Sequence, residues 1–394
     1  MARSIITGID IGTHQIKVVV ASGEERNEKG FPKILGIGVA ESRGLRHGYI
    51  LSPQDVALSI KQAVSEAEKR SGMKIKKAFV AIGGVGLGGV TSTSSIIISR
   101  ADSEITDLDM KKVQDQCEKD LPPGLILNKK IINSIPLHYK LDGKIALGKP
   151  EGMKASKFEI KMLYVTCLEH HLNDIIQSVE EAGISVQDVV AAPIASSFVT
   201  LSKSQKMAGC VLVNIGAETV SIAVFENNTP VSIEVLPIGS TDITNDIALG
   251  LKVPLEEAEQ IKIGAITGSS YPRKKLEEII SARLSDVFEL IENHLKKIGR
   301  NGLLPAGIVI VGGGAGLSGI EELAKNALRL PSRIGLVHLG IQDKQSFRDS
   351  TWSIAYGLCV LGAHTEEEVP IDTSAQFFIK MWKGALNWIK QFLP

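Results

Sequence analysis

The feature that most constrains this chain is an internal repeat. Residues Ile9–Val20 can be laid over residues Val213–Val224. Each stretch has an apolar strand ending in a polar residue, then an apolar residue, a glycine, a short polar turn and a second strand. Short patterns of this kind also occur in two unrelated hairpins. Because each copy begins its own half of the chain, the repeat favours a duplicated α/β domain.

The bulk composition fits two domains and excludes several other classes. The chain has 394 residues, of which 44% are hydrophobic, and a single core rarely grows past roughly 250–300 residues. Its formal net charge is zero, so no basic surface is expected and nucleic acid is excluded as a partner. The four cysteines form no CxxC pair and the eight histidines no HExxH motif. These spacings argue against a disulfide framework and a zinc site.

The N-terminus and the hydropathy pattern bear on localisation. The first residues lead directly into a strand-like run, without the apolar region and cleavage site of a signal peptide. No stretch reaches the roughly 18 apolar residues that a membrane-spanning helix needs. We therefore expect a cytoplasmic protein that is either soluble or bound to a membrane surface.

Local patterns predict alternating strands and helices, as in α/β proteins. Pro53–Arg70 is a predicted helix with Ser52 as its N-cap. Its apolar face comprises Val56, Ile60, Ala63, Val64 and Ala67. A second helix is predicted over Leu172–Ala182, ending before Gly183. The predicted strands are Thr7–Ile11, Ile16–Ala21, Lys77–Ile82, Val211–Ile215, Val220–Phe225, Ile308–Val311 and Ile334–Leu339.

The repeated hairpin has the chemistry of a phosphate site. A tight turn between two strands points consecutive backbone N–H groups into one concavity, which suits an anion. Gly12 lets the backbone come close to a phosphate, Thr13 adds a hydroxyl donor, and Lys17 supplies a positive charge. Asp10, at the strand end, can hold a water of hydrated Mg²⁺. Two such hairpins facing each other would clamp a di- or triphosphate from both sides.

A third glycine element, Ile308–Ala315, completes a resemblance to the superfamily of actin, sugar kinases and heat-shock chaperones. In that superfamily such a strand and turn pack against adenosine, and two helices connect the halves. Ala191–Ser197 and Ser353–Gly357 look like these helices. The resemblance implies an α/β, actin-like fold that binds ATP and Mg²⁺, with Asp10 holding Mg²⁺ through water. The implied ATP contacts are Asp10, Gly12, Thr13, His14, Lys17, Asn214, Gly216, Ala217, Glu257, Gly312, Gly313, Gly314, Ala315 and Ala355.

Two other glycine-rich motifs have competing interpretations. Gly314–Gly319 fits the GxGxxG pattern of a Rossmann fold, which requires an acidic residue roughly 20 positions later, at the end of the next strand. The next strand-like run, Ile334–Leu339, carries no acid, so an NAD site is not expected. The run Gly83–Gly89 could pass for a phosphate loop. Because no helix follows it, it is predicted as a flexible turn.

Within the superfamily, the chain most resembles the bacterial cell-division family FtsA. The segments Ser42–Ile50, Gly152–Ala155 and Lys252–Glu259 carry this resemblance. Several acids follow Pro254 in the last segment, an arrangement that suits the dipole of any helix. The resemblance implies in addition that Glu257 or a neighbour contacts the ribose or the adenine.

The resemblance also implies a domain organisation. The first half would comprise residues 1–83, 166–200 and 341–364, interrupted by an inserted subdomain, 84–165, that is peculiar to FtsA. The second half would have a core, 201–230 with 300–340, and a smaller subdomain, 231–299. A linker, 365–374, and a C-terminal amphipathic helix, 375–394, would follow.

Asn214 departs from the pattern of the superfamily. Actin-like ATPases carry an aspartate in the second phosphate hairpin, at the position that Asn214 occupies here. An asparagine can orient a water molecule but cannot take its proton. The substitution favours ATP binding over turnover, so weak or no ATPase activity is expected.

The C-terminal segment has the composition of a helix that lies on a membrane. Ala375–Leu393 holds two of the three tryptophans of the chain, three lysines and no acid. An apolar face would enter the lipid surface while lysines meet anionic headgroups. The alternative is a helix that packs on its own protein. The expected membrane contacts are Phe377, Phe378, Met381, Trp382, Lys383, Leu386, Trp388, Ile389, Lys390 and Phe392.

The resemblance to FtsA implies a protein that polymerises on the cytoplasmic membrane at the division site and tethers filaments of the tubulin-like protein FtsZ. Its implied partners are the C-terminal tail of FtsZ, received by residues 231–299, further copies of itself, anionic lipids and other division proteins. Two alternatives stay open. One is another actin-fold scaffold, similar to PilM or MreB, and the other is a sugar or metabolite kinase.

Overall fold

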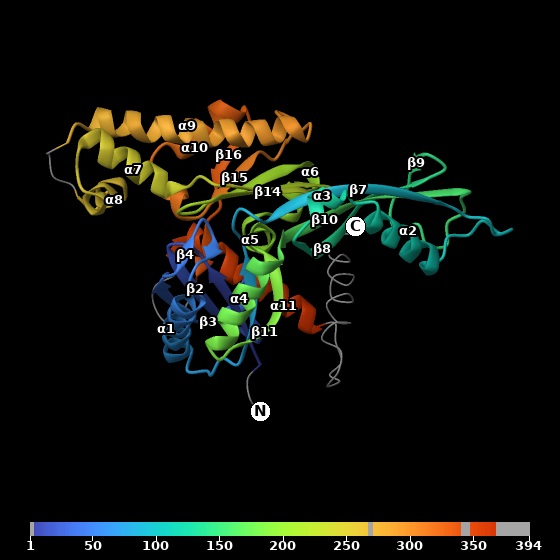
Figure 1. The fold of residues 1–394 in the computed structure, drawn as a ribbon, viewed down its shortest axis with the longest axis horizontal. Coiled ribbons are helices and arrows are strands. Elements are labelled where there is room, and N and C mark those ends of the chain that lie inside the picture. Colours follow the sequence, from blue (N-terminus) through green and yellow to red (C-terminus); the bar gives the residue numbers. More distant parts are fainter. Residues whose placement is uncertain (1–3, 267–270, 340–346, 368–394) are drawn as a thin grey trace.

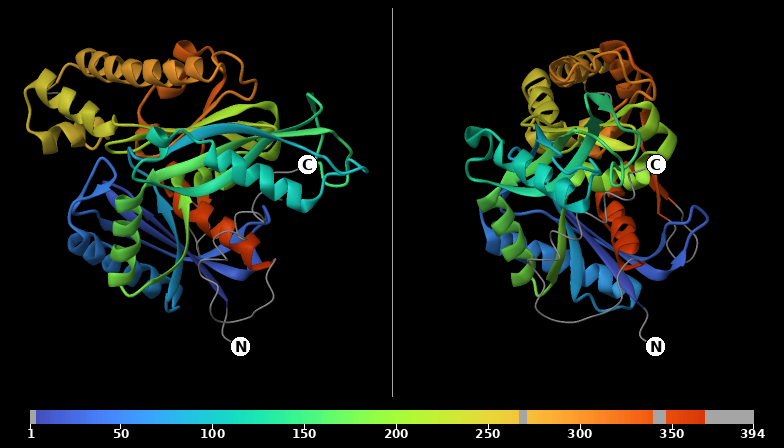
Figure 2. Two further views of the ribbon diagram at one scale, coloured as in Figure 1. Left: turned by 45° about the vertical axis from the view of Figure 1, so that its right-hand side comes forward. Right: turned by 90° about the vertical axis from the view of Figure 1, so that its right-hand side faces the viewer.

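The computed structural model describes residues 4–266, 271–339 and 347–367. It contains two bodies of sheet and helix, one above the other in Figure 1, and a third, elongated part that extends to the side. The lower body holds the N-terminal strands and the last helix. The upper body holds the strands from β12 (Cys210–Ile215) to β16 (Ser332–Ile334) and the helices between them. The views in Figure 2 show the same three parts from other directions.

The lower body is built on a five-stranded sheet of order β11-β6-β1-β2-β3. Strands β1, β2 and β3 form an antiparallel meander, and β6 and β11 add in parallel. Helices α1 and α4 pack on one face, while α5 and α11 pack on the other. The elements are β1 (Ile5–Ile11), β2 (Gln15–Arg26), β3 (Pro32–Glu41), α1 (Pro53–Ser71), β6 (Lys77–Ile82), α4 (Glu169–Glu181), β11 (Ser185–Ala191), α5 (Ala192–Thr200) and α11 (Ser353–Glu367).

The upper body repeats this topology, which confirms the predicted duplication. Its sheet has the order β14-β13-β12-β15-β16, again an antiparallel meander extended by two parallel strands. Side chains of β12 point alternately into the core of the upper body and the core shared with the lower body. The elements are α6 (Lys203–Ala208), β12 (Cys210–Ile215), β13 (Val220–Glu226), β14 (Thr229–Leu236), α7 (Ser240–Leu251), α8 (Leu255–Lys262), α9 (Arg273–Lys297), β15 (Ile308–Val311), α10 (Ile320–Leu328) and β16 (Ser332–Ile334).

The third part is inserted between β6 and α4 and has its own hydrophobic core. Its sheet has the order β7-β10-β8-β9, with α2 packed against β7 and β10. Its elements, β7 (Gly88–Ile97), α2 (Asp107–Lys119), α3 (Pro123–Ile126), β8 (Lys129–Leu141), β9 (Lys144–Ile145) and β10 (Lys157–Leu168), fall close to the predicted insertion 84–165. Strand β7 also contacts β14, so the insertion touches both bodies.

The ends of α1 show how the sequence sets a local boundary. The hydroxyl of Ser52 accepts a hydrogen bond from the N–H of Asp55 at 3.5 Å, which satisfies a donor left free at the helix start. At the other end Gly72 adopts φ 68°, the left-handed conformation that closes many helices. The residues predicted for its apolar face are all buried. Both predicted features of this helix, its N-cap and its buried face, are confirmed.

The two helices predicted to connect the halves are present and cross each other. In α11, a Cβ on Gly357 would lie only 1.9 Å from the carbonyl oxygen of Ala195 in α5. The crossing is therefore a backbone-to-backbone contact that a larger residue at 357 would push apart. Helix α11 packs on β1, β2 and β6 of the lower sheet, whereas α5 contacts strands of both sheets.

Three predicted boundaries are wrong. The strand predicted over Ile334–Leu339 is broken, since β16 ends at Ile334 and a separate strand, β17 (Val337–Leu339), pairs with β18 (Phe347–Asp349). The break falls at Gly335, where a Cβ would lie 2.7 Å from Val311. The boundary at residue 231 cuts through β14, which belongs to the sheet. Helix α11 runs to Glu367 and so takes in the first residues of the predicted linker, 365–374.

The predicted C-terminal helix, 375–394, lies outside the described residues, as does the rest of the predicted linker. All the membrane contacts predicted from the sequence fall in that segment. Within the described part of the chain, every helix is too short or too polar to cross a bilayer.

Candidate functional site

The first predicted phosphate hairpin is formed by β1 and β2. Its strands pair in a register that places Asp10 opposite Lys17. The N–H of Gly12 donates to the carbonyl oxygen of Gln15 at 3.2 Å, which closes the turn. A Cβ on Gly12 would lie 2.9 Å from that same oxygen, so a side chain there would strain the closure. Glycine is needed here to bring the turn together.

The second hairpin, formed by β12 and β13, has the same construction. Asn214 lies opposite Ser221, as Asp10 lies opposite Lys17. The N–H of Gly216 donates to the carbonyl oxygen of Thr219 at 2.9 Å, and a Cβ on Gly216 would lie 3.0 Å from it. The start of α7 fixes this turn, because the N–H of Ser240 donates to Gly216 O at 2.9 Å.

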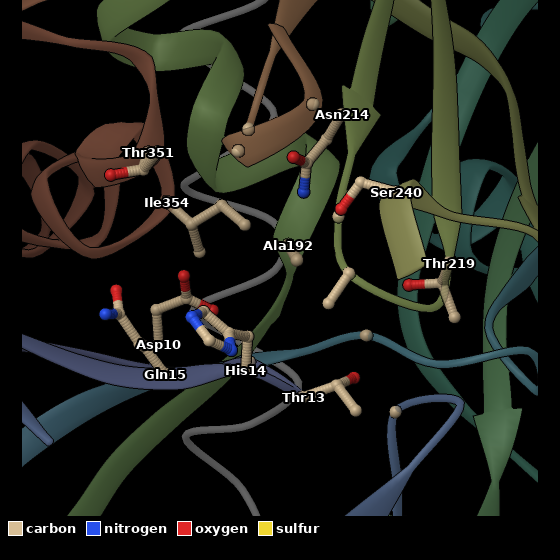
Figure 3. Close-up of a pocket in the computed structure, with 18 of the residues that line it drawn as sticks. Asp10, Thr13, His14, Gln15, Ala192, Asn214, Thr219, Ser240, Thr351 and Ile354 are labelled. Atoms are coloured by element: carbon tan, nitrogen blue, oxygen red, sulfur yellow. The ribbon is translucent and has the colours of Figure 1, made fainter. Parts of the chain in front are cut away.

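Both turns open into one cavity of about 590 Å³ between the two bodies. Figure 3 shows Asp10 and His14 on one side of it and Asn214 and Ser240 on the other. Such a volume is in the range of small-molecule and cofactor sites. The predicted residues that line it are Asp10, Gly12, Thr13, His14, Lys17, Asn214, Gly216, Ala217, Gly312, Gly313 and Gly314.

The glycine turn after β15 forms another wall of the cavity. Gly312 has φ 89°, and a Cβ there would lie 2.2 Å from the side-chain oxygen of Asn214. A Cβ on Gly314 would press on Ile215 at 2.4 Å, whereas one on Gly313 would meet nothing within 4 Å. Gly312 and Gly314 are thus required by packing, while Gly313 presents bare backbone to the cavity.

A charged pair lies at the base of the first hairpin. Burial raises the pKa of Asp10 to about 6, against the opposing attraction of Lys17. Burial also lowers the pKa of Lys17, while Asp10 and Asp349 raise it. The Lys17 ammonium lies 5.8 Å from the ring centroid of Trp352, close enough for a cation–π contact. Burial thus shifts the pKa of both groups toward their neutral forms, and perturbed pKa values of this kind are common at binding and catalytic sites.

Three predicted contacts do not line the cavity. Glu257 lies two residues from Glu259, which does line it, and positions two apart on a helix face different directions. Ala315 is 1% exposed and packs in the core of the upper body. Ala355 is fully buried, and its carbonyl oxygen packs against Gly8 of β1. The predicted elements do border the cavity, but these three residues lie on faces that do not line it.

A polar network on α8 was missed by the sequence argument. Lys262 forms a 2.6 Å ion pair with Glu259 and donates to the carbonyl oxygen of Ser240 at 3.1 Å. Thr244 Oγ1 donates to Glu259 at 2.6 Å. Glu259, Lys262 and the neighbouring Ile263 all line the cavity. Their spacing of three and four residues puts them on one helix face, and this was the signal available in the sequence.

Further residues that line the cavity were not predicted as contacts from the sequence. Among them are Gly48, in the hairpin of β4 (Leu45–Arg46) and β5 (Tyr49–Ile50), and the pair Gly83 and Gly84. The glycine run Gly83–Gly89 was predicted only as a turn. The structure has a turn over its first five residues, whereas Gly88 and Gly89 begin strand β7. The remaining lining residues are Ile11, Gln15, Leu45, Ala81, Ile175, Ala192, Thr219, Ser221, Ser240, Thr241, Gly316, Leu317, Thr351, Ser353 and Ile354.

Few side chains of the cavity could bind a metal ion. Within the described ranges, no group of three or more histidine, cysteine or acidic side chains is arranged to hold a metal ion. Of the residues that line the cavity, only Asp10 and Glu259 are acidic. This set fits an ion such as Mg²⁺, which keeps several waters and binds through one or two carboxylates together with phosphate.

Two sheets of one topology, each with a glycine-closed hairpin on a shared cavity, define the actin class of fold. Solved structures agree. The PilM-PilN type IV pilus biogenesis complex matches with a TM-score of 0.68 and 17% identity, covering 92% of this chain and 99% of that one. MreB5 of Spiroplasma citri bound to ADP matches with a TM-score of 0.51 and 12% identity, covering 93% and 99%. These likenesses establish the fold alone.

Sequence comparison identifies the family. A family model described as "Cell division protein FtsA" matches residues 211–357, and one described as "SHS2 domain inserted in FTSA" matches residues 88–166. The cell division protein FtsA of Pseudomonas aeruginosa is 30% identical over 387 residues, covering 92% of this chain and 90% of the relative. That of Borreliella burgdorferi is 30% identical, covering 93% of each. The chain belongs to the FtsA family.

Proposed function

We propose that the cavity between the two bodies binds ATP with Mg²⁺. One observation carries the proposal: two glycine-closed turns of identical construction face the same cavity, and a bare glycine turn forms its third wall. Consecutive backbone N–H groups in such turns suit phosphate oxygens. The solved structures of MreB5 bound to ADP and to AMPPNP share this fold and support the proposal.

Each wall would have its own task. Gly12, Thr13, His14 and Lys17 would hold phosphates from one side, and Gly216 and Ala217 from the other. Asp10 would hold Mg²⁺ through water. The backbone at Gly313 would lie against adenosine, and Glu259, in place of the predicted Glu257, would face the ribose or the base.

Turnover of ATP should be slow. Mg²⁺ supplies charge stabilisation to a phosphoryl group when it is bound, but hydrolysis also needs a group that accepts the proton of the attacking water. Asn214 stands where an acid would be required and has no such capacity. We expect about one turnover per minute, against the roughly 1–10³ per second of ordinary enzymes.

We further propose that the protein polymerises on the cytoplasmic membrane during cell division and tethers FtsZ filaments to it. Membership of the FtsA family supports this role, together with the apolar and basic composition of residues 375–394. The subdomain that would receive the FtsZ tail comprises α7, α8 and α9, with its boundary moved past β14. Anionic lipids, further copies of the chain and other division proteins would be the remaining partners.

The membrane role can be tested by co-sedimentation with anionic vesicles in the presence of Mg-ATP and an FtsZ tail peptide. Deleting 375–394 should release the protein from vesicles and leave ATP binding intact. Trp388→Glu should abolish vesicle binding at any salt concentration, because it puts a charge on the lipid face. Lys383→Gln should weaken binding modestly, and mostly at low salt.

The melting temperature of each variant is the control. If the helix instead packs on its own protein, Trp388→Glu should lower the melting temperature by several degrees. Such a fall, with vesicle binding no better in the wild type than in the deletion, would contradict the anchoring role.

A further inference from the structure

The β4–β5 hairpin connects the two bodies across the mouth of the cavity. Among the described residues, its strands, β4 (Leu45–Arg46) and β5 (Tyr49–Ile50), pair only with each other. In Figure 1 it projects from the top of the lower body toward the upper one. Leu45 and Gly48 from this hairpin line the cavity. It is therefore placed to cover whatever the cavity holds.

The base of the hairpin is fixed to the lower body. The N–H of Leu51 donates to the carbonyl oxygen of Gly44 at 2.7 Å, which joins the two ends of the hairpin. Gly48, at φ 79°, approaches Gly84 so closely that a Cβ would lie 2.5 Å from the Cα of that residue. The ring of Tyr49 packs edge-on against His171 of α4, with centroids 5.2 Å apart. The hairpin thus moves with the lower body.

The tip of the hairpin bonds to the upper body. The backbone N–H of His47 donates to the carboxylate oxygen of Glu218 at 2.5 Å, and His47 Nδ1 lies 3.4 Å from the carbonyl oxygen of Glu218. His47 adopts φ 48°, which is uncommon for a residue with a side chain. Glu218 lies between Ala217 and Thr219, in the second phosphate turn.

We infer that His47 and Glu218 form a latch that holds the cavity closed over a bound nucleotide and limits its release. This inference rests on the proposed nucleotide site. Separating the two bodies would break the latch, since its partners lie on opposite sides of the cavity. A hydrogen bond to a carboxylate is among the stronger ones available to a backbone N–H. The latch bond also fixes the turn that would hold phosphate.

The test compares Glu218→Ala with Glu218→Gln. The alanine variant loses the acceptor, whereas the glutamine variant keeps an oxygen at the same place without the charge. A fluorescent ATP analogue is bound to the full chain and chased with excess ATP in a stopped-flow instrument. We expect release to be about tenfold faster for Glu218→Ala and at most about threefold faster for Glu218→Gln. Glu28→Ala, at an exposed residue between β2 and β3, is the matched control and should release at the wild-type rate.

Amide exchange of His47 gives a second measurement that needs no nucleotide. The latch predicts a protected His47 amide in the wild type and loss of that protection in Glu218→Ala. Equal release rates and equal exchange in the two proteins would overturn the latch while leaving the nucleotide site standing. Absence of analogue binding by the wild type would overturn the nucleotide site, and with it the role of the latch. In that case His47 exchange would still report whether the contact itself forms.

Discussion

The two hairpins that face the cavity share their geometry but not their charge. Each is closed by a glycine N–H to a carbonyl oxygen three residues later, at 3.2 Å in the first and 2.9 Å in the second. Each places one polar residue of the first strand opposite one of the second. In the first hairpin these residues are Asp10 and Lys17, and in the second they are Asn214 and Ser221.

The two copies of the repeat therefore share their backbone geometry but differ in their paired side chains. The glycine closure follows from backbone sterics and is the same in both copies. The paired side chains lie on the strands next to the turn, and they determine the charge of each hairpin. An ionisable pair in one hairpin and a neutral pair in the other make an asymmetric site, in which the first hairpin would supply charge and the second hydrogen bonds alone.

The largest expected contrast is between Lys17 and Ser221, which occupy equivalent places in the two hairpins. Lys17→Gln should weaken Mg-ATP binding by roughly 100-fold, because a buried charge that would meet phosphate is lost. Ser221→Ala, at the equivalent place, should weaken it by less than about threefold. Titration with a fluorescent ATP analogue measures both. Equal effects at the two positions would show that the hairpins are functionally symmetric.

A second contrast concerns the first members of the pairs and the pH dependence of stability. A carboxyl whose pKa is raised in the folded state favours folding at low pH and loses that contribution as pH rises through the folded value. For Asp10 that value is about 6. Asp10→Asn should therefore change stability little at about pH 4 and stabilise the nucleotide-free protein by roughly 2 kcal/mol at pH 8.

The opposite substitution in the second hairpin, from asparagine to aspartate, is the control for Asp10→Asn. Asn214→Asp introduces a carboxyl into the equivalent position and should destabilise the nucleotide-free protein at pH 8 more than at low pH. Urea unfolding at both pH values measures these free energies. A stabilisation by Asp10→Asn that is the same at both pH values would contradict the account of Asp10.

The smallest expected effect concerns turnover. Asn214→Asp supplies the second hairpin with a group that can accept a proton, so the rate of ATP hydrolysis should not fall and should rise by a few-fold at most. Phosphate release under saturating Mg-ATP measures the rate. A wild-type rate of several per second with a defined acceptor would instead favour a kinase.

The sequence predicted the parts of the molecule that depend on local pattern. The strands Lys77–Ile82 and Ile308–Val311 have the predicted bounds, and the repeat predicted the duplicated sheets. Backbone periodicity and glycine placement suffice for these features because they are set within a few residues. The glycine turns at residues 12 and 216 are of the same kind.

The sequence failed where the outcome depends on how one element docks on another. The helix that bears Glu257 was predicted, but its rotation toward the cavity, which selects Glu259, is set by packing. Gly335 breaks a predicted strand because it approaches Val311. The contact between His47 and Glu218 joins residues 171 positions apart. No local pattern specifies such contacts.

The central claim, that Mg-ATP occupies the cavity between the two bodies, is tested most directly by calorimetric titration of wild type and Gly313→Glu. A side chain at 313 meets no protein atom within 4 Å of its Cβ, so the variant should fold normally. It would place a negative charge in the cavity. The account predicts saturable 1:1 binding by the wild type and no detectable binding by Gly313→Glu at an unchanged melting temperature. Equal affinity in the two proteins would contradict it.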